Sequence, residues 1–149
     1  MRPSVLIADD HRLYAEGLRS LLSPLYEIVA IAENGQELVK LAAQHKPDLI
    51  VTDISMPVMT GLDAIQELSR QGSPAKFIVL TMHREVGLAV LAFRYGASAF
   101  LLKTGRGDEL IEALSVVQEG RRFLSADFSQ KLDDILAEAA LTASHGIHP

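Results

Sequence analysis

Five polar residues of this sequence each follow a short apolar run, and their side chains are of the kinds that bind metal ions and phosphate. They are Asp9, Asp10, Asp53, Thr81 and Lys103. The apolar runs before them cover residues 5–7, 49–51, 77–80 and 99–102. Such runs, separated by helical patterns, are typical of parallel strands buried on both faces of a sheet. Because ligands collect at the carboxyl ends of these strands, we expect the five side chains to gather at one edge.

Three carboxylates in one place predict a cation site. Asp9, Asp10 and Asp53 would repel one another unless a positive charge lay among them. Oxygen ligands suit a hard divalent ion, and Mg²⁺ tolerates sparse protein ligation completed by water. A carboxylate beside Mg²⁺ can attack phosphorus and form an aspartyl phosphate, with Lys103 adding positive charge and Thr81 a hydroxyl donor. One strand-end aspartate often only caps a loop, but five such residues together favour a site.

The apolar pattern alternates five times between strand and helix. The expected strands cover residues 5–8, 28–31, 49–52, 77–80 and 99–102. Apolar residues at helical spacing predict helices around residues 13–22, 38–42, 61–69, 86–93 and 110–117. Asn34 and Glu37 predict an N-cap and capping box for the second helix. Gly96 is a natural end for the fourth helix.

This alternation implies right-handed crossovers and helices on both faces of a parallel sheet. The predicted fold is α/β, flavodoxin-like and doubly wound: five parallel strands in the order 2-1-3-4-5, flanked by five helices, plus a C-terminal linker helix. In this order the chain reverses direction between the first and third strands, and ligands bind at that switch point. Asp53 would lie there between the acidic pair and Thr81 and Lys103, which makes it the best nucleophile.

Composition narrows the class of protein. A length of 149 residues with 48% hydrophobic content suffices for one domain with its own core. The absence of cysteine excludes disulfides and thiolate metal sites. No stretch approaches the ~20 apolar residues that span a bilayer, and a strand pattern at the start leaves no room for a signal peptide, so we expect a cytoplasmic protein without a membrane partner. A net charge of −5 argues against nucleic-acid binding by this part alone.

The pattern changes after residue 124. Apolar residues at helical spacing predict a sixth, amphipathic helix, and they are Phe128, Leu132, Ile135, Leu136 and Ala139. Ser125 is its expected N-cap. Residues 142–149 show no periodicity and are interpreted as linker. We therefore divide the chain into residues 1–124 and residues 125–149, and we leave open whether the sixth helix packs on the domain or meets a partner.

Over Val5 to about Leu124 the sequence closely resembles the receiver domain of bacterial two-component response regulators. The motifs that carry the resemblance are the Asp9–Asp10 pair, Asp53 with the following Met56-Pro57 and Gly61, and then Thr81, Phe100 and Lys103. The stretch Gly120–Ser125 is similar to the NarL/FixJ branch, whose members usually continue into a LuxR-type helix-turn-helix domain. No such domain follows here, so we expect a receiver with a linker, either cut from a longer protein or naturally short.

The resemblance implies a phosphorylation-controlled regulator of transcription rather than a multiple-turnover enzyme. A sensor histidine kinase would transfer a phosphoryl group to Asp53, assisted by Mg²⁺. The implied metal ligands are Asp9, Asp10, Asp53 and the backbone carbonyl of Ser55. Thr81 and Lys103 would contact the phosphoryl oxygens, and Thr81 and Phe100 would form the switch. The active form would be a homodimer, and DNA would be bound only through an output domain outside this chain.

Two other classes of protein share parts of this pattern. A Mg²⁺-dependent phosphatase resembling the haloacid dehalogenase family would need a second aspartate where Ser55 stands, and a degenerate receiver would not keep all five polar residues. His11 is interpreted as a first-turn helix residue rather than a metal ligand. His83, two residues after Thr81, could position water beside the phosphoryl group, although a solvated loop residue is favoured. Many receivers have a cis proline after the lysine, whereas Thr104 follows here, and the geometry of that bond is left open.

Overall fold

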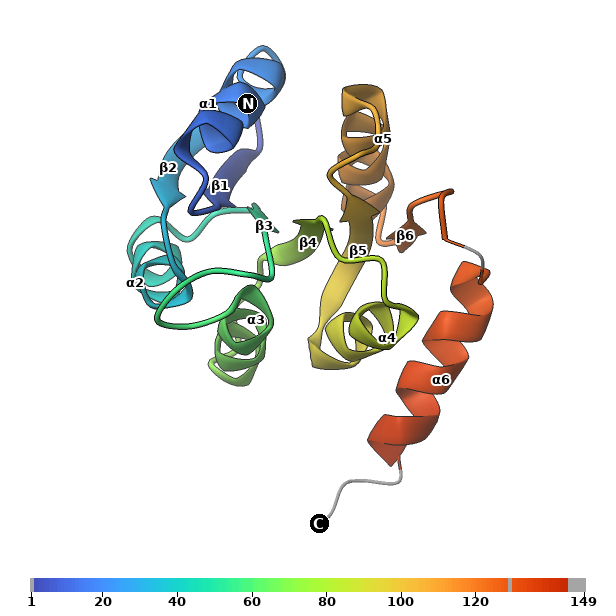
Figure 1. Cartoon of the computed structure of the whole chain (residues 1–149). Coiled ribbons are helices and arrows are strands. Elements are labelled where there is room, and N and C mark those ends of the chain that lie inside the picture. Colours follow the sequence, from blue (N-terminus) through green and yellow to red (C-terminus); the bar gives the residue numbers. More distant parts are fainter. Residues whose placement is uncertain (1, 129, 145–149) are drawn as a thin grey trace.

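The computed structural model describes residues 2–128 and 130–144, and in it strands and helices alternate along the chain (Figure 1). Six parallel strands form one sheet in the order β2-β1-β3-β4-β5-β6. The strands are β1 (Ser4–Ala8), β2 (Glu27–Ala32), β3 (Leu49–Thr52), β4 (Lys76–Thr81), β5 (Ala97–Leu102) and β6 (Phe123–Leu124). The helices are α1 (Arg12–Leu22), α2 (Gly35–His45), α3 (Gly61–Arg70), α4 (Val86–Tyr95), α5 (Gly107–Gln118) and α6 (Leu132–Ser144). The predicted fold class and the order of the first five strands are confirmed.

Helices cover both faces of the sheet and bury an apolar layer on each. Helices α1 and α5 pack on one face, whereas α2, α3 and α4 pack on the other (Figure 1). Alternate residues of a strand serve the two layers, so Val5 and Ile7 of β1 join the α1/α5 layer and Leu6 joins the other. Because both faces are buried, the middle residues of the central strands are apolar, and the polar residues of the site lie at or just after the strand ends. The sheet thereby confines its polar chemistry to its edges.

The loop between β3 and α3 folds closely back on the end of β3. A Cβ atom on Gly61, the first residue of α3, would lie 1.8 Å from the Asp53 carbonyl oxygen, so only glycine fits there. Thr60 caps α3 by accepting a hydrogen bond from the Asp63 backbone N–H. Val58 in the same loop has a φ of 71°, a left-handed conformation that is costly for a β-branched residue. The fold thus accepts local strain beside Asp53.

The predicted cap of α2 forms with one difference. Asn34 Oδ1 accepts a hydrogen bond from the Glu37 backbone N–H at 2.8 Å. In a capping box the glutamate would return this bond to the N-cap residue itself. Here Glu37 Oε1 instead accepts from the backbone N–H of Glu33, one residue earlier, at 2.7 Å.

The sheet has a sixth strand that the sequence analysis did not predict. Strand β6 pairs with β5 through Ala99↔Phe123 and Phe100↔Leu124, and two residues are too few to show a periodic pattern. The prediction of Ser125 as the N-cap of the sixth helix is wrong, because α6 begins at Leu132. Ser125 is buried instead, with its backbone N–H donating to the Phe100 carbonyl at 3.0 Å. Ser125 therefore bonds to residues distant in the sequence instead of capping the helix, which local propensity had predicted.

The predicted C-terminal helix is present, and the structure decides its location. Helix α6 lies along α4 (Figure 1). It continues to Ser144, so residues 142–144 are helical where linker was predicted, and residues 145–149 lie outside the described residues. Within residues 2–128 and 130–144, no helix is long and apolar enough to cross a membrane.

Candidate functional site

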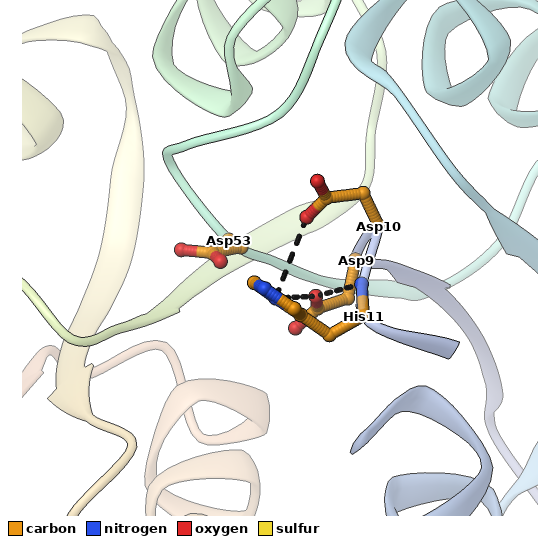
Figure 2. Close-up of side chains that lie close together, drawn as sticks. All are labelled: Asp9, Asp10, His11 and Asp53. Carbon is orange, nitrogen blue, oxygen red and sulfur yellow. Dashed lines mark hydrogen bonds and ion pairs between the residues drawn. The ribbon is translucent and has the colours of Figure 1, made fainter. Parts of the chain in front are cut away.

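Three carboxylates meet at the carboxyl edge of the sheet, where the chain reverses direction between β1 and β3. Asp9 and Asp10 follow β1, and Asp53 follows β3, its neighbour in the sheet. Asp9 and Asp53 are buried, whereas the side chain of Asp10 is 34% exposed. The three carboxylates and the His11 ring each offer one ligand atom, and these four atoms all lie within 4.8 Å of one another (Figure 2). The site is therefore a compact anionic cluster with one side open to solvent.

Lys103 enters this cluster from the end of β5. Its Nζ lies 2.7 Å from Asp9 Oδ2 and 2.9 Å from Asp53 Oδ2, and its side chain is 6% exposed. Burial disfavours the charged form, but hydrogen bonds to Asp9 and Asp53 outweigh it and raise the pKa of Lys103 above its ordinary value. Lys103 is therefore a constant cation that joins β5 to β1 and β3.

The ring of Tyr14 in α1 packs against the ammonium group of this lysine. Lys103 Nζ lies 4.4 Å from the centroid of the Tyr14 ring, a cation–π contact. Burial raises the pKa of the Tyr14 phenol, although the nearby Lys103 acts in the opposite direction. The ring thus remains neutral and presents its face to the ammonium group. The sequence carries no local signal for this role of Tyr14, because Tyr14 and Lys103 are brought together only by the packing of α1 on the sheet.

Asp53 and Thr81 follow or end the neighbouring strands β3 and β4, and both bond to Lys103. Asp53 Oδ1 accepts a hydrogen bond from the Ile54 backbone N–H at 2.6 Å, which orients the carboxylate. Thr81, fully buried at the end of β4, accepts a bond from the His83 backbone N–H at its Oγ1 and from the Lys103 backbone N–H at its carbonyl oxygen. The Thr81 hydroxyl keeps its proton to donate. The ends of β4 and β5 are therefore linked directly beside the buried carboxylate.

The donor set fits a hard divalent cation. Asp9, Asp10 and Asp53 offer carboxylate oxygens within a few ångströms, and the exposed Asp10 gives solvent water access to the same place. Lys103 alone does not neutralise three carboxylates, so the site keeps a net negative charge that a divalent ion would compensate. This cluster is one that could hold a metal ion. The participation of the Ser55 backbone carbonyl stays a prediction.

Two histidines contact site residues although the sequence analysis interpreted both as bystanders. His11 lies immediately before α1 rather than in its first turn, with Nδ1 3.3 Å from Asp9 Oδ1 and 3.5 Å from Asp10 Oδ1 (Figure 2). His83 Nε2 lies 2.7 Å from Ser55 Oγ and so joins the loops that follow β3 and β4. Adjacency to the acidic pair was the available signal for His11. The contact between His83 and Ser55 spans 28 residues, and its signal in the sequence is that each lies two residues after a predicted site residue, Thr81 and Asp53 respectively.

Phe100, the predicted switch residue, is fully buried in β5. Its ring packs edge-to-face on Phe128, with centroids 5.4 Å apart and planes at 71°. On the next strand its register partner is Val79 of β4. The structure thus places Phe100 in the core between the site and the C-terminal residues, and its switching role stays a prediction. The described residues contain no cis peptide bond, so Thr104 follows Lys103 through a trans bond.

The fold and the site together define a doubly wound α/β domain with a buried carboxylate in an acidic cluster that could hold a metal ion. The family model described as the response regulator receiver domain matches residues 5–115. The chain therefore belongs to the receiver domain family of response regulators, which confirms the resemblance found in the sequence.

Individual relatives agree with this assignment. The chain is 35% identical over 130 residues to the transcriptional regulatory protein DegU of Brevibacillus brevis, covering 86% of this chain and 55% of DegU. A two-component response regulator of the LuxR family from Aurantimonas sp. SI85-9A1 superposes with a TM-score of 0.82 at 29% identity, covering 95% of this chain and all of that chain. A structure of two RcsB dimers bound to two parallel DNAs gives a TM-score of 0.77 at 26% identity, covering 83% of this chain and 64% of that one. The chain thus spans about half the length of DegU.

Proposed function

We propose that this chain accepts a phosphoryl group on Asp53 from a sensor histidine kinase and thereby controls transcription through an output domain. The observation that carries the proposal is the environment of the Asp53 carboxylate. It is 5% exposed, it lies in a cluster of oxygen ligands suited to Mg²⁺, and it contacts a lysine whose charge is constant. A buried carboxylate beside this much negative charge has no evident structural purpose in a sheet that is already well packed.

The proposed reaction is an in-line displacement at phosphorus. One Asp53 carboxylate oxygen attacks the phosphorus of a phosphohistidine, a P–O bond forms, the P–N bond breaks, and the imidazole of the donor leaves. The Ile54 backbone N–H and Lys103 orient the carboxylate through its two oxygens, so little motion is needed before attack. The product is a mixed anhydride of phosphate with the Asp53 side chain.

Charge compensation would come from the residues around Asp53. Bound Mg²⁺ would offset negative charge on the transferring group, and Asp9, Asp10, Asp53 and the Ser55 carbonyl would hold it. Lys103 and Thr81 would contact the phosphoryl oxygens, since both lie beside the carboxylate at the ends of β5 and β4. In the described structure Lys103 is shared with Asp9, so it would have to shift toward the added oxygens.

The further parts of the proposal concern partners. We assign residues 1–124 to the receiver and residues 125–149 to a segment that leads toward a helix-turn-helix output domain. DegU, a relative that regulates transcription, is considerably longer than this chain, which supports an output domain in the full-length protein. The RcsB dimers on DNA support a homodimer, because a two-fold protein matches a two-fold DNA site. The cytoplasmic location stays a prediction.

Phosphorylation of the purified chain tests the proposal. We expect incubation with acetyl phosphate and Mg²⁺ to add one phosphoryl group, detected by intact-protein mass spectrometry, and we expect EDTA to prevent it. The Asp53→Asn variant should stay unmodified. Asp63→Asn is the matched control, because Asp63 is an exposed aspartate in the first turn of α3 and should leave the modification unchanged.

Two results would contradict the proposal. Modification that persists in Asp53→Asn would place the phosphoryl group elsewhere. Repeated release of phosphate on the time scale of a phosphatase, without accumulation of the modified protein, would indicate an enzyme rather than a receiver.

A further inference from the structure

The imidazole ring of His11 lies against the anionic cluster formed by Asp9, Asp10 and Asp53 (Figure 2). Its Nδ1 is 3.3 Å from Asp9 Oδ1 and 3.5 Å from Asp10 Oδ1. The side chain is 71% exposed, so an ion can reach this nitrogen from solvent. A cation bound only through oxygen atoms would make no use of a ring nitrogen that lies among the ligand atoms of the cluster.

The backbone holds the ring in this place. His11 is the N-cap residue of α1, with a φ of −87° and a ψ of 96°, and its side chain makes no capping bond to the helix. Its backbone N–H instead donates to Asp9 Oδ1 at 2.8 Å, which fixes His11 to the first carboxylate of the cluster. The imidazole therefore has no part in ending the helix, and its Nδ1 faces the carboxylates.

The spacing of the ligand atoms suits a shared metal ion and is long for a direct hydrogen bond. N–H···O bonds in proteins mostly measure about 2.7–3.2 Å between the heavy atoms, and both distances from His11 Nδ1 are longer. Two ligand atoms on one tetrahedral ion lie about 3.3 Å apart when each bond to the ion is about 2.0–2.1 Å. The three carboxylates and the ring each have one ligand atom within 4.8 Å of the others, so small side-chain rotations would bring all four to one ion.

Lys103 leaves the His11 side of the cluster accessible. Its Nζ contacts the Oδ2 atoms of Asp9 and Asp53, whereas His11 approaches the Oδ1 atoms of Asp9 and Asp10. An ion beside His11 Nδ1 would therefore not have to displace the buried lysine. Because one lysine leaves three carboxylates with a net negative charge, a divalent ion on this side would also offset that charge.

A ring nitrogen changes which ions the cluster prefers. Mg²⁺ takes oxygen ligands and gives up its water reluctantly, so an imidazole adds little to its binding. Imidazole suits Zn²⁺ and Ni²⁺, and affinity for divalent ions generally rises from Mn²⁺ through Co²⁺ to Ni²⁺. Three carboxylates with one imidazole are therefore a donor set for a transition-metal ion.

We propose that His11 Nδ1 is a fourth ligand of this cluster and makes it selective for divalent transition-metal ions, of which Zn²⁺ has the matching tetrahedral spacing. Such an ion would bind the same carboxylates as Mg²⁺, so each ion would exclude the other. The inference uses the cation site of the proposed function and goes beyond it, because binding by these four groups does not require phosphoryl transfer.

Metal titration of the whole chain tests the proposal. His145 and His148 also carry imidazoles, so the parent chain for every titration is the His145→Gln/His148→Gln variant. We expect His11→Gln to weaken Zn²⁺ binding, measured by calorimetry, by about tenfold or more, since loss of even a supporting partner of a metal ligand costs about 10–100-fold. Its affinity for Mg²⁺ should not change. His45→Gln, at an exposed histidine in the last turn of α2, is the matched control and should change neither affinity.

Two further measurements identify the ligand atom and the location of the ion. In the ¹⁵N spectrum of the histidine side chains of the parent, Zn²⁺ should fix the His11 ring with Nδ1 bound to the metal and the proton on Nε2, and the His45 ring should not change. Excess Mg²⁺ should weaken the apparent binding of Zn²⁺, and Asp10→Asn should weaken the binding of both ions. The spectrum needs no variant, and urea unfolding in EDTA should show that His11→Gln is as stable as the parent, because the replaced ring is mostly exposed.

Several results would overturn the inference. Zn²⁺ affinity that is the same in His11→Gln and the parent, or a His11 ring spectrum that Zn²⁺ leaves unchanged, would remove the nitrogen from the ligand set. An equal loss of Zn²⁺ and Mg²⁺ affinity in His11→Gln would show that the ring supports the cluster without selecting the ion. Zn²⁺ binding that excess Mg²⁺ does not weaken would place the ion elsewhere.

Failure of this inference is distinguishable from failure of the proposed function. Phosphorylation of the same parent chain by acetyl phosphate and Mg²⁺, measured by intact mass, does not require a nitrogen ligand. Normal modification of Asp53 with no role for His11 in Zn²⁺ binding would overturn the inference alone. Absence of binding by either ion would overturn the inference together with the role of Mg²⁺ in the proposed function.

Discussion

Replacing Lys103 with methionine should destabilise the protein unless Mg²⁺ is present. The ammonium group lies 2.7 Å and 2.9 Å from two carboxylates that are 2% and 5% exposed, and methionine keeps the apolar stem while removing the charge. Asp9 and Asp53 would then remain buried and unpaired beside Asp10. Removing one partner of a buried ion pair costs about 3–5 kcal/mol, since the remaining charge stays desolvated.

The structure indicates the lower end of this range. Asp10 is 34% exposed, so water and counterions reach the cluster from one side and partly screen it. Loss of the cation–π contact with Tyr14 adds about 0.5–1 kcal/mol. We therefore expect a loss of about 3–4 kcal/mol in the free energy of unfolding, or roughly 6–16 °C in Tm at about 2–4 °C per kcal/mol for a chain of this size.

Urea unfolding followed by circular dichroism, with EDTA and with Mg²⁺, measures the effect. A divalent ion supplies the missing positive charge, so Mg²⁺ should restore a larger share of stability to Lys103→Met than it adds to the wild type. Lys40→Met, at an exposed lysine on α2, is the control and should stay within about 0.5 kcal/mol of the wild type. A loss below about 1 kcal/mol in EDTA, or a loss that Mg²⁺ leaves unchanged, would refute the electrostatic reasoning.

Two further predictions concern the cation site and the loop beside it. Asp10→Asn should weaken Mg²⁺ binding by about tenfold or more, equivalent to about 1.4 kcal/mol, with little effect on stability in EDTA because Asp10 is partly exposed. Calorimetric titration with Mg²⁺ measures the affinity, and Asp108→Asn is the control. An unchanged affinity would remove Asp10 from the ligand set. Gly61→Ala should cost about 3 kcal/mol or more because its Cβ would meet the Asp53 carbonyl at 1.8 Å. Gly87→Ala has open space and lies in a helix, so it should instead gain about 0.5–1 kcal/mol in chemical unfolding; equal effects of the two substitutions would contradict the close approach.

Local signals in the sequence predicted the elements well where the pattern was long. Both faces of β1, β3, β4 and β5 are buried, so their apolar runs were unambiguous, and Asn34 and Glu37 marked the start of α2 by side-chain chemistry alone. The pattern failed at β6 and Ser125. Two residues have no period, and the polar groups of Ser125 bond to Phe100 and Glu109, which are distant in the chain.

For the site, too, local sequence predicted some features and tertiary packing decided the others. The sequence by itself determined that Asp9, Asp10, Asp53, Thr81 and Lys103 stand at strand ends, because the apolar runs of doubly buried strands end just before them. Only the tertiary structure decided which of these groups touch. The pairing of Lys103 with both Asp9 and Asp53, the ring of Tyr14 beside it, and the docking of α6 on α4 depend on how helices pack across strands. Such contacts join residues far apart in the chain, and their energies come from burial and charge in the assembled core, which no local stretch of sequence contains.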